Sequence, residues 1–218
     1  MLTAVVGDWT ETLELAERFR IGWERTGQLP RRGFDTTLSA AAMVCGLRGD
    51  DVSREWWLDV SARTRALPRL ADEGGARPAI GYRDMFDAVL HLHRGQADLA
   101  VATVVRPPDQ LDDWRSAVWR QWYAALWAEA AVMADRPDQV ERLASARRIT
   151  AGNPVAASIV DRAQAVANGA LTSLPSVAAA LAAAGCRYQQ ARTLVLAGGD
   201  HQTSGERILA AIGATPMA

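Results

Sequence analysis

The feature that most constrains this chain is a turn of glycine and polar residues that recurs at intervals of 30 to 46 residues. The turns stand at Gly7-Asp8, Gly49-Asp50, 95–98, 135–138, Gly169 and Gly199-Asp200. Glycine closes helices and polar residues open them, so this period fits repeats that each hold two helices. A helix pair with one apolar face cannot bury that face alone. Neighbouring pairs must therefore stack.

Between the turns the apolar residues keep helical spacing. Leu13, Ala16, Phe19 and Trp23 form one helical stripe, and no segment alternates long enough to indicate a strand. Alanine, used heavily here, has the smallest conformational cost in a helix. We therefore expect an all-α fold, a right-handed α-solenoid of antiparallel helix hairpins. Its 10 or 11 helices are expected near 9–26, 34–47, 51–66, 79–94, 97–105, 112–134, 137–150, 154–168, 174–184, 187–197 and 203–212.

Two segments interrupt this rhythm and mark possible subdivisions of what is otherwise a single domain, 1–218. The segment 67–78 contains two prolines and two glycines, which is typical of a surface loop. The segment 106–110 contains Pro107-Pro108, which disfavours helix for the residue before it. Either segment could rim a binding surface, but most loops only connect, and we favour plain connectors.

The charge pattern excludes several classes of function. The net charge is −1, so nothing indicates a polyanionic partner, and we expect no direct binding of nucleic acid. All 24 basic residues are arginine. A P-loop and a Schiff-base enzyme both need a lysine, so both classes are excluded.

The apolar and cysteine patterns indicate a cytoplasmic protein. No apolar run approaches the ~20 residues of a membrane span, and the first residues have no basic region ahead of an apolar one, so we expect no secretory leader here. Cys45 and Cys186 lie far apart in apolar helical settings. We expect them to be buried, reduced thiols.

Eight tryptophans provide the candidate binding residues. Neighbours on a helix point about 100° apart, so Trp56 and Trp57 cannot share a face. The functional interpretation is an aromatic-lined groove for a peptide or a flat small molecule. The alternative is packing between layers, which we favour because aromatic side chains dominate protein cores. The candidate residues are Trp56, Trp57, Trp119, Trp122, Tyr123 and Trp127.

Catalytic and metal-binding motifs are weak. His91 and His93 stand two residues apart, whereas ligands on one helical face need a spacing of three or four. Asp109, Asp112 and Asp113 could hold Mg²⁺ and a diphosphate, but acidic residues are also favoured in the first turn of a helix. We expect no catalytic residue, no metal and no cofactor.

The segment Ala178–Ala214 resembles the last repeats of a known helical domain. The matching residues are Leu181, Ala184-Gly185-Cys186, Tyr188, Ala191-Arg192, Leu194, Ala197-Gly198-Gly199, Leu209 and Ile212-Gly213-Ala214. They are similar to the tetratricopeptide-like region of large bacterial LuxR-family or STAND ATPase transcriptional regulators and cyclase-like signalling proteins. Arg187 departs from that pattern, which usually has proline there.

The resemblance implies a regulatory role without catalysis. We expect a scaffold or sensor module that binds a protein partner or an output domain. A small-molecule effector in an aromatic-lined pocket is the alternative, and a small helical Mg²⁺-dependent enzyme that uses Asp109 to Asp113 is a remote one. A homodimer is also an open possibility, because an end repeat with an uncovered apolar face seeks a neighbour.

Overall fold

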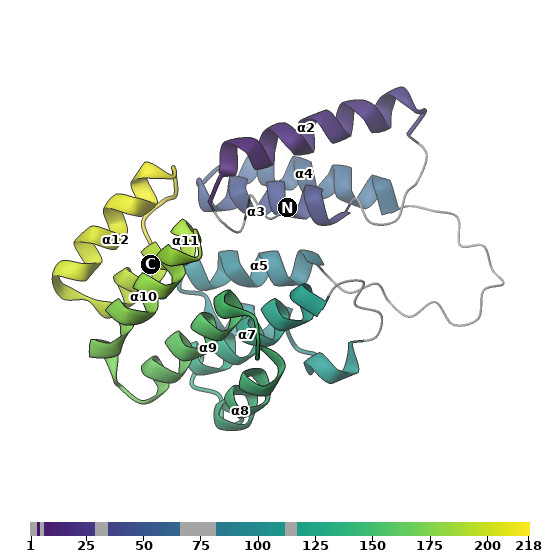
Figure 1. Cartoon of the computed structure of the whole chain (residues 1–218). Helices are drawn as coiled ribbons and strands as arrows, with labels where there is room; N and C mark the ends of the chain where they lie inside the picture. The colour runs from purple at the N-terminus through teal and green to yellow at the C-terminus, as the bar shows by residue number, and fades with distance from the viewer. Residues whose placement is uncertain (1–3, 5–6, 29–34, 66–81, 112–116) are drawn as a thin grey trace.

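The architecture is all-α, as the spacing predicted (Figure 1). The computed structural model describes residues 4, 7–28, 35–65, 82–111 and 117–218, and no strand occurs among them. The α-helices are α2 Trp9–Arg25, α3 Asp35–Leu47, α4 Asp51–Arg65, α5 Tyr82–His93, α6 Ala97–Thr103, α7 Ala117–Met133, α8 Gln139–Ile149, α9 Pro154–Ala167, α10 Leu174–Ala183, α11 Arg187–Ala197 and α12 Gly199–Ala211. Two short 3-10 helices, η1 Pro108–Gln110 and η2 Leu171–Ser173, lie between them.

The helix ends follow the local signals of the sequence. Asp8 caps α2, because its Oδ1 accepts the N–H of Glu11 at 3.1 Å. Asn153 caps α9 in the same way, ahead of Pro154. The last helix differs from expectation, since α12 begins at Gly199 rather than at residue 203. The break from α11 lies at Gly198, whose φ of 75° a side chain would strain.

The helices pack in a regular order. The helices α3, α5, α7 and α9 contact one another in that sequence, while α4, α6 and α8 each contact the helix that precedes them. Helices α10, α11 and α12 continue the chain of contacts from α9. Figure 1 shows this order as a path from the purple helices to the yellow ones.

The two ends of the chain also meet. The rings of Trp9 in α2 and Tyr188 in α11 lie 5.8 Å apart. Beyond α12, the N–H of Thr215 donates to the carbonyl of Leu47 at the end of α3, at 2.8 Å. The N–H of Ala218 donates to the carbonyl of His93 at the end of α5, at 3.3 Å. The C-terminal tail therefore ties the last helix to the first half of the chain.

The apolar core also joins the two ends of the chain. Its main cluster of buried residues runs from Ala4 to Ile212 and draws on α3, α5, α7, α9 and α11. A second cluster joins α2, α3 and α4. Helix α3 lies between the two clusters, and every residue from Leu38 to Leu47 is buried. A helix that is apolar on all sides must be covered on all sides.

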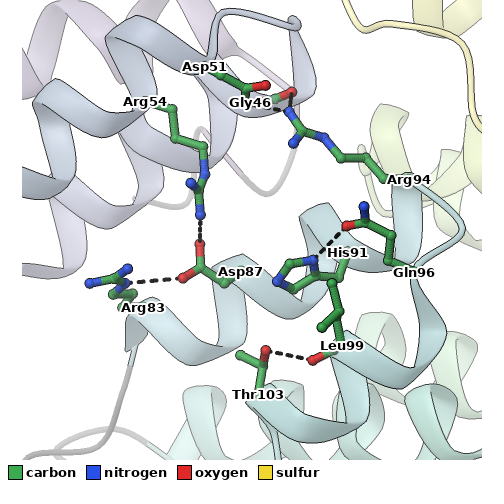
Figure 2. A network of polar contacts seen from close by, with 10 residues as sticks. All are labelled: Gly46, Asp51, Arg54, Arg83, Asp87, His91, Arg94, Gln96, Leu99 and Thr103. Atoms are coloured by element: carbon green, nitrogen blue, oxygen red, sulfur yellow. Dashed lines mark hydrogen bonds and ion pairs between the residues drawn. The ribbon is translucent and has the colours of Figure 1, made fainter.

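Charged side chains bridge α4 and α5 (Figure 2). Asp87 of α5 accepts from Arg54 of α4 at 2.7 Å and from Arg83 at 3.1 Å. Arg94 spans the same gap, donating to the carbonyl of Gly46 at 3.0 Å and to Asp51 at 2.6 Å. These contacts link the α3–α4 hairpin to α5 and to the residue that follows it.

The structure describes one of the two segments that we expected to be connecting loops. The segment 67–78 lies outside the described residues. The segment 106–110 contains η1 and is tied to α7, because the hydroxyl of Tyr123 donates to the carbonyl of Arg106 at 2.9 Å. Val104 and Leu111 on either side belong to the main core cluster, so the apolar packing continues across this segment.

The packing of α12 on α11 generates a prediction about glycine. A Cβ at Gly205 would lie 2.6 Å from the carbonyl oxygen of Ala191 and 2.8 Å from Cγ2 of Val195. Gly205→Ala should therefore lower the free energy of unfolding by about 1–3 kcal/mol, as overpacking does. Gly22→Ala, in an exposed helix interior with nothing within 4 Å, should raise it by about 0.5–1 kcal/mol. Urea unfolding measures both, and equal gains for the two variants would contradict the close approach.

Candidate functional site

A cleft lies where the two ends of the chain meet. Its volume is about 650 Å³, within the usual ~300–1,000 Å³ range of ligand pockets. Four segments provide its walls: the start of α2, the end of α3, the turn before α11, and the end of α12. The residues are Gly7, Asp8, Trp9, Thr10, Arg48, Gly185, Arg187, Ala210, Ala211, Ile212 and Gly213.

Two arginines give the cleft its charge. Arg48 and Arg187 are both exposed, and neither has a carboxylate within 4 Å among the residues that the structure describes. Arg48 instead lies over the ring of Trp9, with 6.0 Å from its guanidinium carbon to the ring centroid. Asp8 is the acidic residue in the lining, and its Oδ1 is occupied by the cap of α2. The cleft therefore carries a surplus positive charge and favours an acidic ligand.

The back wall of the cleft is rigid. Trp9 is 1% exposed, and its indole N–H donates to the carbonyl of Ala4 at 3.2 Å. Tyr188 packs between Trp9 and His93, with ring centroids 5.8 Å from each. Gly213 has a φ of 80°, a backbone conformation that favours glycine, and a Cβ there would make an ordinary contact with Nε of Arg48 at 3.5 Å. Aromatic packing thus holds the wall beneath the two exposed arginines.

Behind this wall lies a fully buried ion cluster. Glu129 of α7 accepts two hydrogen bonds from Arg162 of α9, at 2.7 and 3.0 Å. It accepts two more from Nη1 of Arg192 of α11, at 2.9 and 2.8 Å. Arg162 also donates to the hydroxyl of Thr193 at 3.0 Å and to the carbonyl of Gln189 at 3.3 Å. Three helices are joined through one carboxylate.

The electrostatics of the cluster keep Glu129 ionised. Burial alone would raise the pKa of Glu129, but the charges of Arg162 and Arg192 outweigh burial and hold that pKa below its ordinary value. Burial raises the pKa of the neighbouring Tyr188 to about 12, so its phenol keeps its proton. Two guanidinium groups and one carboxylate leave a net charge of +1 in the core.

A small cavity lies against Tyr188 and Gln189 of α11. Its volume is about 20 Å³, enough for one water-sized particle. It is lined mostly by apolar side chains from α3, α5 and α7 and closed by α11. The lining residues are Ala4, Met43, Met85, Phe86, Val89, Trp122, Leu126, Tyr188 and Gln189.

His93 links the C-terminal tail to the same region. With a proton on Nε2, it donates to the carbonyl of Thr215 at 3.1 Å. Burial, together with the charge of Arg192, lowers the pKa of His93 to about 4. The imidazole is therefore neutral at pH 7.

The structure separates the aromatic residues that the sequence singled out. Trp57, Trp119, Trp122, Tyr123 and Trp127 are all buried. Trp57 belongs to the second core cluster, while the other four belong to the main one. In the main cluster, Trp119 meets Tyr82 edge-on at 5.7 Å, Trp122 borders the small cavity, and Trp127 lies 4.6 Å from the guanidinium of Arg142. These five side chains pack between helices and do not line a shared groove.

Trp56 is the exception among the six. It is 43% exposed on α4, and its ring meets that of Trp57 at 4.6 Å. Arg20 of α2 lies over it, with the guanidinium carbon 5.7 Å from the ring centroid. Neither Trp56 nor Arg20 lines the cleft.

The structure describes only part of the weaker motifs. Asp112 and Asp113 lie outside the described residues, as does Trp114. Within the described part of the chain, no group of three or more His, Cys, Asp or Glu residues is placed to hold a metal. Cys45 and Cys186 are buried and free, and burial raises the pKa of both thiols. No helix among the described residues is long and apolar enough to cross a membrane.

Comparison with protein-family models, with curated proteins and with solved structures gives no significant match.

Sequence reasoning did not identify the cleft or the ion cluster as sites. One signal was available: Glu129 is a single acidic residue within an apolar helix, and such a residue needs a buried partner. Arg48 and Arg187 had no such signal, because each looks like an ordinary charge at a helix end.

The ion cluster generates a prediction about stability. Glu129→Gln would leave two buried guanidinium groups without a carboxylate, which should cost about 3–5 kcal/mol of unfolding free energy. Glu206→Gln, at an exposed position of α12, should change it by less than about 0.5 kcal/mol. Urea denaturation measures both values. A loss below about 1 kcal/mol for Glu129→Gln would mean that the cluster does not hold the three helices.

His93 generates a prediction about pH. Its folded-state pKa of about 4 lies below the value of about 6.5 expected in the unfolded chain, so the unfolded state binds the extra proton. Stability from neutral His93 is complete above pH ~6.5 and should fall by about 3 kcal/mol as the pH drops to 4. Urea unfolding of wild type and His93→Gln across this range isolates the effect. The exposed His201→Gln is the control, and identical pH profiles for wild type and His93→Gln would contradict it.

Proposed function

We propose that this chain is a non-enzymatic binding module that docks an acidic segment of a protein partner in the cleft between its two ends. The observation that carries the proposal is the pair Arg48 and Arg187, which face the cleft without carboxylate partners. Acidic side chains of a partner would complete these ion pairs. The buried ring of Trp9 lies beneath Arg48 and supports its guanidinium group.

The wider role follows the resemblance of the C-terminal segment. We propose a tetratricopeptide-like helical repeat, a right-handed solenoid whose last hairpin returns to the first, acting in bacterial transcription regulation or signalling. The order of helix contacts supports the repeat. A protein partner is favoured over an effector in an aromatic pocket, because five of the six candidate aromatic residues are used in packing. The proposal assigns no catalytic residue.

A labelled acidic peptide tests this proposal. Fluorescence anisotropy of a fluorescein-labelled hexaglutamate peptide should show binding that weakens as salt is raised, since exposed ion pairs are screened. Arg48→Glu and Arg187→Glu should each weaken binding several-fold, because each replaces attraction by repulsion worth roughly 1 kcal/mol at an exposed site.

The control is Arg18→Glu, which makes the same charge change on an exposed face of α2 outside the cleft. It should leave the affinity within about twofold, since charges more than a Debye length apart are largely screened. Equal losses for all three variants would show only a general charge effect. No binding by the wild type at low salt would overturn the acidic partner.

A further inference from the structure

The helix that carries Arg48 ends with an open carbonyl. Gly49 follows α3 with a φ of 78°, and the N–H of Asp50 beyond it returns to the carbonyl of Cys45 at 2.9 Å. Helix α12 ends in the same way at Gly213, with a φ of 80°. Such an ending leaves the carbonyl of Leu47, the last residue of α3, without a partner in its own helix.

Thr215 of the C-terminal tail supplies the missing donors. Its N–H and its hydroxyl lie 2.8 and 3.2 Å from the carbonyl oxygen of Leu47. Its carbonyl and hydroxyl oxygens lie 3.1 and 3.2 Å from Nε2 of His93. Gly49 leaves room for its methyl group, because a Cβ there would lie 3.0 Å from Cγ2 of Thr215. One tail residue thus joins the ends of α3 and α5 through every polar group that it has.

These contacts stand next to the cleft in sequence. Arg48 follows Leu47 directly, and Gly213 stands two residues before Thr215. Arg48 and Gly213 both line the cleft. Because the guanidinium of Arg48 has no carboxylate within 4 Å among the residues that the structure describes, its place in the cleft depends on the backbone that carries it.

The second arginine of the cleft is held in a different way. Arg187 begins α11, and the ring of Tyr188 beside it packs 5.8 Å from that of Trp9. The contacts of Thr215 lie on α3 and α5 instead. The two arginines therefore have separate supports, and a change at Thr215 should act on Arg48 alone.

We infer that Thr215 is a positioning residue of the cleft. By closing the end of α12 onto the end of α3, it holds Arg48 where one acidic segment reaches both Arg48 and Arg187. This inference rests on the proposed function. It adds that affinity for the acidic segment depends on an uncharged side chain outside the lining of the cleft.

Removing the hydroxyl of Thr215 provides the first test. In the hexaglutamate anisotropy assay at low salt, Thr215→Val should weaken binding about three- to tenfold, the equivalent of one hydrogen bond, although the charge of the cleft is unchanged. Thr215→Ser keeps the hydroxyl and should bind within about twofold of wild type. Wild-type affinity in Thr215→Val would overturn the inference.

The matched control is Thr64→Val. It removes a buried hydroxyl that donates to the carbonyl of Ser61 at 2.8 Å, and Thr64 does not line the cleft. Urea unfolding should show a loss of stability, while the affinity for hexaglutamate should stay within about twofold of wild type. Equal weakening of binding by Thr64→Val and Thr215→Val would reduce Thr215 to a general contributor to stability and would overturn the inference.

A double-mutant cycle provides the second test, because residues that act through one another are not additive. Thr215→Val should weaken binding by less than about twofold in an Arg48→Gln background. In an Arg187→Gln background it should keep its full effect. The same loss in both backgrounds would contradict a role through Arg48. No binding by the wild type would overturn the proposed function and this inference with it, whereas wild-type binding that Thr215→Val leaves unchanged overturns this inference alone.

Discussion

The bond on which the rest of the structure depends is the bidentate clasp of Glu129 by Arg162 and Arg192. It joins α7, α9 and α11 through residues that are 33 and 63 positions apart in the chain. Because each ion is fully desolvated, a packing that separates any one of them leaves a charge exposed to a low-dielectric interior. The cluster therefore acts as a registry device: the three helices fit together in one relative position, in which the carboxylate reaches both guanidinium groups.

The position of α11 determines what happens at the chain ends. Once Arg192 is held, Tyr188 one turn earlier lies against Trp9 and His93, and Arg187 faces the start of α2. The tail beyond α12 then reaches the open ends of α3 and α5 and satisfies the carbonyls of Leu47 and His93. The cleft is a consequence of this closure, since its walls come from the first and last helices. A change that separates the first and last helices should therefore also change the shape of the cleft.

The large aromatic side chains and the alanines have complementary roles. In α7, buried alanines from Ala124 to Ala131 let neighbouring helices approach closely, while Trp119, Trp122 and Trp127 fill the wider gaps between them. Aromatic residues used in this way are committed to packing. Trp56 differs, because its ring is partly exposed and Arg20 lies over it.

The sequence by itself determined the helices and most of their ends. Glycine turns, the Asp8 and Asn153 caps and 3.6-residue periodicity are local signals, and local signals act within a few residues. Only the tertiary structure decided which charges meet. Glu129 and its two arginines, and the pair Arg48 and Arg187, come from helices far apart in sequence, and no local pattern distinguishes a buried arginine from an exposed one. Their partners are selected by the angles at which helices stack, and those angles are a property of the whole core.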